Sequence, residues 1–195
     1  MTVESRDDRS RLIALLKRDA LRTGAFTLAS GRTSHYYVDG RKVTLSAEGA
    51  LLIGTGILEV LDDLVANASV VVAVGGLTMG ADPIVGATLA VAGARGLNRW
   101  RGFLVRKEAK QHGTGRLIEG PLDPTDLVVI VDDVATTGGS SLQAVEAVQA
   151  IGCKVARVVV VLDRLEGAAE AFASRGLDFR SLVTIRDLGV EPLRG

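Results

Sequence analysis

Continuous apolar runs recur along this chain and predict the strands of a buried sheet. Each run is short and rich in Val, Ile or Leu, without the apolar and polar alternation of a strand that has one wet face. The expected strands are Val70–Val74, Gly102–Val105, Val128–Val131, Val155–Leu162 and residues 181–185. Such runs are typical of parallel strands, so the pattern predicts an α/β fold with a mainly parallel central sheet flanked by helices.

Helical periodicity fills segments between these runs. Apolar residues recur three and four positions apart, which places them on one face of a helix. The expected helices cover residues 10–22, 47–61, 142–151 and 167–175. Ser10 and Ser46 are candidate N-caps of the first two helices, and Gly152 is a candidate stop for the third.

Length, charge and cysteine content narrow the class of protein. With 195 residues, we expect one α/β domain spanning 1–195. The 23 basic and 23 acidic residues balance, so no overall field favours nucleic acid or an anionic membrane. The single cysteine, Cys153, excludes an internal disulfide and is predicted to be a small buried residue before a strand. No secretory signal or membrane-spanning run is visible, so we expect a cytoplasmic protein.

The stretch VVIVDDVATTGGS, residues 128–140, carries the strongest chemical signal. Its strand delivers Asp132 and Asp133 to the sheet edge where open α/β folds bind ligands. The small residues from Ala135 to Ser140 leave backbone N–H groups accessible to an anion such as phosphate, while the carboxylates can accept hydrogen bonds from sugar hydroxyls. The stretch therefore predicts a site for a phosphorylated sugar; the alternative is a tight turn whose Asp and Thr residues only cap the following helix.

This stretch resembles the signature of the type I phosphoribosyltransferases, which bind 5-phosphoribosyl 1-pyrophosphate (PRPP) through such a strand, acid pair and loop. The resemblance implies the type I phosphoribosyltransferase fold with a small N-terminal hood, here roughly residues 1–45. The acid pair would orient the ribose hydroxyls and favour a developing oxocarbenium ion, with Asp133 in a catalytic role, and the loop would anchor the 5′-phosphate. The implied PRPP-binding residues of this stretch are Asp132, Asp133, Val134, Ala135, Thr136, Thr137, Gly138, Gly139 and Ser140.

Two further segments are similar to orotate phosphoribosyltransferases but depart from some of them. Residues 26–39 predict a hairpin around Ser30-Gly31-Arg32 and resemble the hood segment that covers the base, although many members have Lys where this chain has Ala29. The glycine-rich GGLTMGADPI, residues 75–84, resembles the pyrophosphate loop. Other branches carry Tyr-Lys within that loop, whereas Met79-Gly80 here leaves only backbone contacts.

The segment RKEAKQHGTGRLIEG, residues 106–120, gathers cationic groups beside glycines. It can be a solvated hairpin, or a loop that closes over pyrophosphate and neutralises the leaving group. It resembles the family's flexible catalytic loop, Arg-Lys-x-x-Lys-x-His-Gly, which reaches the neighbouring subunit, so the resemblance implies a homodimer. It also implies catalytic roles for Lys107, Lys110 and His112, which together with Arg106 would bind PRPP.

Arg164 is the candidate residue for the base. It follows the strand 155–162, at the same sheet edge as the acid pair, where a guanidinium could form a fork onto a carboxylate. Family members have a similar Asp-Arg-x-x-Gly whose Arg contacts orotate, and Thr136 matches a loop position that also meets the base. The alternative is a structural ion pair of Arg164 with Asp163 or Glu166.

The expected reaction is that of an orotate phosphoribosyltransferase: orotate and PRPP give orotidine 5′-monophosphate and pyrophosphate, in de novo pyrimidine (UMP) biosynthesis. Mg²⁺ is the expected cofactor, held mainly by pyrophosphate and water, with no protein ligand assigned. One alternative is a phosphoribosyltransferase for a purine or uracil, which the central stretch does not exclude. Another is a PRPP-sensing regulator that binds nucleic acid; the balanced charge and the intact Lys107, Lys110 and His112 count against it.

Overall fold

The computed structural model describes residues 3–27, 33–65, 72–108 and 117–193. Its centre is a six-stranded sheet in the order β5-β4-β3-β6-β7-β8. All neighbouring strands are parallel except β5, which runs antiparallel to β4. The strands are β3 (Val72–Leu77), β4 (Trp100–Val105), β5 (Ile118–Glu119), β6 (Leu127–Ala135), β7 (Lys154–Asp163) and β8 (Phe179–Thr184).

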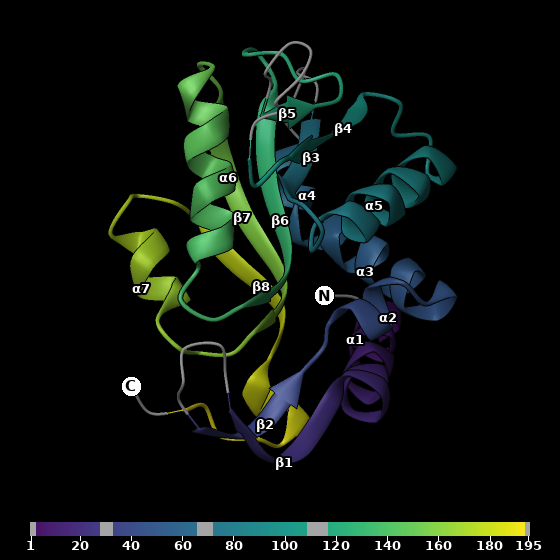
Figure 1. Ribbon diagram of the computed structural model, residues 1–195. Coiled ribbons are helices and arrows are strands. Elements are labelled where there is room, and N and C mark those ends of the chain that lie inside the picture. Colours follow the sequence, from purple (N-terminus) through teal and green to yellow (C-terminus); the bar gives the residue numbers. More distant parts are fainter. Residues whose placement is uncertain (1–2, 28–32, 66–71, 109–116, 194–195) are drawn as a thin grey trace.

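Helices cover both faces of this sheet, as Figure 1 shows. On one side lie α6 (Gly139–Ala150) and α7 (Ala168–Ala173); on the other lie α3 (Ala47–Val60) and α5 (Asp82–Ala94). Adjacent residues of one strand face opposite layers: Val128 and Ile130 join the core under α6, whereas Val129 and Val131 join the core under α3. The continuous apolar strands follow from this two-sided burial, and the expected α/β architecture is confirmed.

The N-terminal segment forms a small separate layer against the end of the sheet. Helix α1 (Val3–Leu15) continues into a short π-helix, η1 (Leu16–Ala20), followed by the antiparallel pair β1 (Leu21–Thr27) and β2 (Thr33–Val38). A short helix, α2 (Arg41–Thr44), leads into α3. Side chains of this hood, including Leu16, Tyr36 and Val43, join the same core as α3 and the sheet. The elements α4 (Asp62–Val65) and η2 (Ile185–Leu188) complete the fold.

Several predicted boundaries are corrected by the structure. The first helix begins at Val3, so Ser10 lies inside it and its hydroxyl donates to the Arg6 carbonyl instead of capping. The strand predicted to end at Val74 is β3, which reaches Leu77; Gly75 and Gly76 therefore lie inside the strand and not in a loop after it.

Other predictions are confirmed. The Ser46 side chain accepts a hydrogen bond from Gly49 N at 3.1 Å as the N-cap of α3. Cys153 is buried directly before β7. Within the described ranges, no helix is long and apolar enough to cross a bilayer, and the cytoplasmic location stays a prediction.

Candidate active site

The acid pair lies near the carboxyl end of β6, inside the strand and not after it. Strand pairing continues past both residues, with Asp132 opposite Val160 and Ala135 opposite Asp163 of β7. The expected strand ends too early because the sequence signal is the loss of apolar character at Asp132, whereas backbone pairing with β7 persists to Ala135. The loop that remains before α6 is therefore short and consists of residues 136–138.

Gly138 makes the sharp entry into α6 possible. It caps the helix with φ 82°, a left-handed conformation that costs glycine little. A Cβ built on it would lie 2.9 Å from the ring of Phe172, so the position also lacks space for a side chain. Thr136 and Thr137 before it are accessible, and Gly139 and Ser140 start the helix with their amides at its positive end. The predicted phosphate loop thus leads directly into the N-terminus of α6, and its role in binding phosphate stays a prediction.

Hydroxyl groups of this helix start are bonded to Asp132. Its Oδ2 accepts from Ser140 Oγ and, at 3.1 Å, from Ser141 Oγ, while its Oδ1 accepts from Asp133 N at 3.0 Å. Asp132 is almost fully buried, and these donors stabilise its charge. In this structure the Ser140 hydroxyl is therefore bonded to Asp132.

The Asp133 carboxylate accepts fewer hydrogen bonds than that of Asp132. Its Oδ1 accepts from Val134 N at 2.9 Å. Burial, followed by the charge of Asp132, raises the pKa of Asp133 to about 6. Two carboxylates side by side in a partly buried position disfavour a second negative charge, and such a pair is stabilised when a sugar hydroxyl or a cation reaches it.

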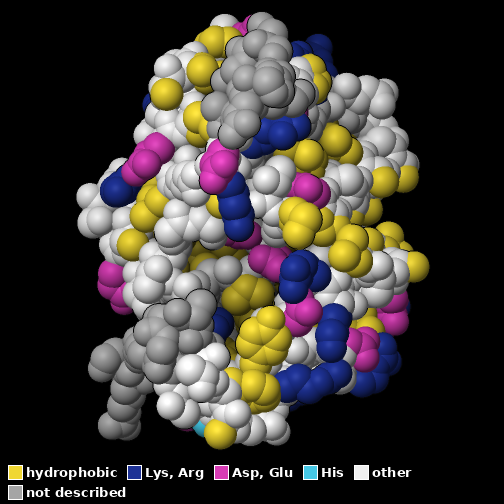
Figure 2. Space-filling model, viewed as in Figure 1, with side chains coloured by type: hydrophobic (Ala, Val, Ile, Leu, Met, Phe, Trp, Pro, Cys, Tyr) yellow, Lys and Arg dark blue, Asp and Glu magenta, His cyan; other side chains and the backbone are white. Residues whose placement is uncertain are grey.

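A cavity of about 260 Å³ brings this pair together with other segments. Figure 2 shows acidic and basic side chains meeting around a hollow on this face. The lining combines the acid pair and Ser140 with the loop after β3 and with basic residues from two other segments. The full set is Arg41, Leu77, Thr78, Met79, Gly80, Lys107, Asp132, Asp133, Val134 and Ser140. The cavity therefore contains the predicted ribose-binding acids, one predicted loop cation and the predicted pyrophosphate loop.

The predicted catalytic loop is described only at its ends. Lys107 is exposed at the cavity, and its carbonyl accepts from Gln143 Nε2 of α6 at 3.2 Å. The Arg106 guanidinium pairs with Glu119 across the β4–β5 hairpin at 3.0 Å and does not line the cavity. Lys110 and His112 lie outside the described residues, as do Ala29 and the turn 30–32. Their predicted roles stay predictions.

Arg164 lies at the same sheet edge as the acid pair, because its backbone N–H donates to the Ala135 carbonyl at 2.9 Å. Its buried guanidinium lies over the Tyr36 ring, 4.8 Å from the centroid, and Nε donates to the Tyr36 hydroxyl at 3.3 Å. Glu166 lies 2.8 Å from Nη2, so the ion pair that the sequence left open is present with Glu166. Asp163 accepts instead from Leu165 N.

Sequence reasoning missed two contributors to this region. The first is Arg41, which lines the cavity but lies just beyond the hood segment 26–39 that the sequence indicated. The second is Tyr36, whose hydroxyl donates to Glu166 Oε1 at 3.0 Å beneath the Arg164 guanidinium. The available signal for Arg41 is the Asp39-Gly40-Arg41 triplet directly after a β-like run, where Gly allows close packing.

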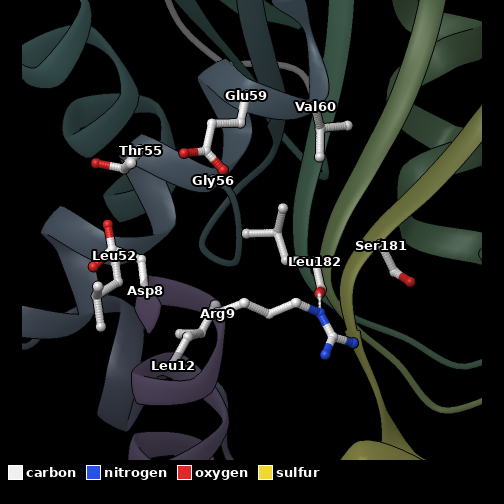
Figure 3. A pocket seen from close by; sticks show the side chains of 10 residues that line it. All are labelled: Asp8, Arg9, Leu12, Leu52, Thr55, Gly56, Glu59, Val60, Ser181 and Leu182. Atoms are coloured by element: carbon white, nitrogen blue, oxygen red, sulfur yellow. Dashed lines mark hydrogen bonds between the residues drawn. The ribbon is translucent and has the colours of Figure 1, made fainter. Parts of the chain in front are cut away.

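A second, smaller cavity has no contact with the acid pair. Figure 3 shows it between α1, α3 and β8, where Arg9 Nε donates to the Leu182 carbonyl at 3.2 Å. Its apolar wall is formed by Leu12, Leu52, Val60 and Leu182. This cavity has no residue in common with the first.

Among the described residues, no group of three or more His, Cys, Asp or Glu side chains is arranged to hold a metal ion. The acid pair by itself offers two carboxylates, which suit Mg²⁺ when substrate oxygens and water supply its other ligands.

The fold and this site are those of a phosphoribosyltransferase. The family model described as "Phosphoribosyl transferase domain" matches residues 72–178, from β3 to the start of β8, which is more than half of the chain.

Comparison with individual proteins narrows the family. The orotate phosphoribosyltransferase of Rhodopirellula baltica is 51% identical over 95% of this chain and 96% of its own length, and that of Thermosynechococcus vestitus is 49% identical over 93% of each. The crystal structure of Mycobacterium tuberculosis orotate phosphoribosyltransferase in complex with PRPP is 39% identical with a TM-score of 0.77, covering 94% of this chain and 99% of that one. This chain belongs to the orotate phosphoribosyltransferase family.

Proposed function

We propose that this protein transfers ribose 5-phosphate from PRPP to orotate, releasing pyrophosphate and orotidine 5′-monophosphate in pyrimidine synthesis. One observation carries the proposal: a single cavity joins Asp132 and Asp133 to Ser140, to the loop Thr78–Gly80 and to Lys107. The reaction requires a ribose to be held while its diphosphate leaves, and these groups surround a space suited to both. The family relationship supports orotate as the acceptor.

The ribose end of PRPP is assigned to the acid pair and the helix start. Asp132 and Asp133 accept hydrogen bonds from the 2′ and 3′ hydroxyls, and residues 135–140 bind the 5′-phosphate through backbone N–H groups at the start of α6. As the bond from C1′ to the diphosphate oxygen breaks, its electron pair leaves with pyrophosphate and positive charge develops on the ribose. Nearby carboxylate charge stabilises that state.

The base end is assigned to Arg164 and Thr136. N1 of orotate forms the new bond to C1′ and its proton passes to solvent; we assign no side chain as the base. The Arg164 guanidinium can bind the orotate carboxylate, and its contacts with Tyr36 and Glu166 fix its position. Glu166 and the incoming carboxylate then share one guanidinium, which presents several donors.

The leaving diphosphate is assigned to Mg²⁺ and to the loop residues Arg106, Lys107, Lys110 and His112. Mg²⁺ suits diphosphate oxygens, retains several waters and neutralises charge on the departing group. Lys107 lines the cavity, which supports its assignment. For Arg106, the pairing with Glu119 must be exchanged or shared when substrate binds.

A homodimer with a shared loop is part of the proposal. Small and apolar side chains of α3 and α5, among them Leu51, Ala87, Ala90, Val91 and Ala94, line an open hollow on the surface. Figure 2 shows hydrophobic side chains gathered on this side of the molecule. Leu51 is 57% exposed, and Met79 of the active-site loop is 67% exposed. An exposed apolar surface of this kind suits a second copy, and the loop of that copy is proposed to reach the site.

A parallel turnover assay tests the substrate assignment. Purified protein with PRPP and Mg²⁺ is given orotate, uracil, hypoxanthine or adenine, and nucleotide formation is followed for each. We expect product from orotate alone. Product from another base but not from orotate would contradict the proposed acceptor, and no product from any base would favour a PRPP-sensing regulator.

Mixed subunits test the shared loop. Lys110→Ala and Asp133→Asn subunits are each expected to be nearly inactive, but mixed dimers should regain activity because one of their sites combines an intact loop with an intact acid pair. Absence of recovery in verified mixed dimers would contradict loop sharing.

A further inference from the structure

The loop after β3 cannot supply a cation to the acid pair. Gly80 packs so closely that a Cβ built on it would lie 2.6 Å from Asp132 Oδ1 and 2.9 Å from Asp133 Oδ1. With the carboxylates in this position, no side chain fits at residue 80. The two carboxylates repel a diphosphate, so a cation in this part of the cavity must come from another segment.

Arg41 is placed to be that cation. Of the described residues that line the cavity, Arg41 and Lys107 are the cationic ones, and they come from different segments. Arg41 opens α2 immediately after Gly40, and Gly40 packs on the acid pair: a Cβ built there would lie 3.1 Å from Asp133 Oδ2. The position of Arg41 is therefore fixed by direct packing of its neighbour against Asp133.

The guanidinium of Arg41 is oriented but still accessible. Nε donates to Asp39 Oδ1 at 3.0 Å, and half of the side chain is exposed. This bond occupies one edge of the guanidinium and leaves its terminal nitrogens without a partner among the described residues. The pKa of Arg41 is raised, mainly by the Asp39 hydrogen bond, with the charge of Asp133 also contributing.

We propose that Arg41 binds the diphosphate of PRPP from within the same subunit, in the place that a loop lysine would otherwise occupy. A guanidinium can bind two diphosphate oxygens at once and keeps its charge at any working pH, so it suits a leaving group that must be oriented and neutralised. This inference rests on the proposed function for the identity of the diphosphate. It assigns Arg41 to substrate contact and Asp39 to positioning Arg41.

Binding measurements on the complete protein separate this role from a structural one. The dissociation constants of pyrophosphate, PRPP and orotidine 5′-monophosphate are measured by calorimetry with Mg²⁺ for the wild type and Arg41→Gln. Because orotidine 5′-monophosphate has no diphosphate, we expect Arg41→Gln to weaken PRPP and pyrophosphate about tenfold or more while the nucleotide constant stays within about twofold.

The matched control is Lys42→Gln, which removes the same charge from the adjacent position of α2: Lys42 shares a neighbouring hollow with Arg41 but does not line the cavity of the acid pair, so it controls for local charge. It should bind all three ligands as the wild type does. Arg41→Lys should recover part of the lost affinity, because a point charge replaces the fork. Thermal unfolding of each variant shows whether the ligands are measured on folded protein.

Two results would overturn the proposal: equal effects of Arg41→Gln and Lys42→Gln, or equal weakening of nucleotide and diphosphate ligands by Arg41→Gln. Since pyrophosphate binding does not depend on the base, failure of orotate turnover in the wild type would contradict the proposed function while leaving this test readable.

Discussion

Asp133 holds its carboxylate where burial and the charge of Asp132 both oppose ionisation. Ligand-binding sites often contain such unfavourable charge, because the ligand removes the cost when it binds. The sequence predicted the adjacent carboxylates as a sugar site from residue type alone. It could not predict their unequal support, since Ser140 and Ser141 both donate to Asp132 and neither donates to Asp133.

The raised pKa of Asp133 gives stability a pH dependence of known sign. The folded pKa of Asp133, about 6, lies above the ordinary Asp value of 3.8, so the native state binds more protons between these values and stability falls as pH rises through this window. Asp133→Asn removes the cost and should raise the free energy of unfolding by about 2 kcal/mol at pH 7.5. Below pH 4 the gain should vanish. Urea unfolding of both proteins across pH 4–8 measures this, and a gain that does not change with pH would contradict the charge argument.

Gly80 offers a second test at the residue scale. A Cβ there would press on both carboxylates, so Gly80→Ala should shift the acid pair and lower kcat/KM for PRPP by about tenfold or more, given the sensitivity of reactions to misplacement. Steady-state kinetics measure the loss. Gly93→Ala is the control: its Cβ would meet nothing within 4 Å, and in α5 it should leave kinetics unchanged and stabilise the helix slightly. Equal kinetics for the two variants would contradict the packing argument.

At the scale of elements, the hood is joined to the sheet by one buried polar cluster. Tyr36 of β2 donates to Glu166 and accepts from Arg164, both from the loop after β7. Burial raises the pKa of the Tyr36 hydroxyl, which therefore stays protonated and available as a donor. The hood and the proposed base-binding guanidinium are consequently fixed by the same contacts.

Removing one oxygen from this cluster should affect base binding selectively. Tyr36→Phe keeps the ring under Arg164 but removes both hydrogen bonds, and should cost about 1–2 kcal/mol of stability. We expect KM for orotate to rise several-fold while KM for PRPP changes little, as measured by varying each substrate. Tyr37→Phe, at an exposed position on the same strand, is the control. A rise in both KM values would instead indicate general loosening of the hood.

Elements with one strong pattern could be predicted, and elements stabilised by distant partners could not. Val155–Leu162 was recognised as a strand because its apolar run needs cover on both faces. Helix α1 was placed too late because its first two turns are charged and have no apolar face. That part of α1 is supported by an ion pair across the fold, Arg9 with Asp187, which no local pattern reveals.

At the scale of the whole molecule, strand order and the shape of the site depend on pairings between distant segments. The sequence indicated parallel strands but not the order β5-β4-β3-β6-β7-β8, nor that β5 closes an antiparallel edge. For the same reason Arg41 was missed: it reaches the acid pair only because the hood packs on the carboxyl end of β6. The site residues that the sequence could predict are those that lie next to other site residues in the chain, such as Asp132 and Asp133.

The proposed homodimer would form through the apolar surface of α3 and α5. Leu51→Glu places a charge in this exposed surface and should weaken a homodimer by about a hundredfold or more, because a buried charge without a partner is costly. Sedimentation equilibrium measures the association. Ile151→Glu, exposed after α6 on the other face of the sheet, should leave it unchanged. A Leu51→Glu protein that associates as the wild type does would place the interface elsewhere.

The hydrogen bonds from Ser140 and Ser141 to Asp132 have a consequence for how the enzyme tells its sugar donor from similar molecules. In the proposed assignment, an arriving 5′-phosphate would compete for the Ser140 hydroxyl, and Asp132 would then need a replacement donor, which the ribose hydroxyls of the same molecule would provide. A ribose lacking the phosphate would find Asp132 already satisfied, and a phosphate lacking the ribose would leave Asp132 short of a donor. Under the proposed assignment, recognition of the phosphate and of the ribose is therefore interdependent, and a ligand that carries both groups should bind best.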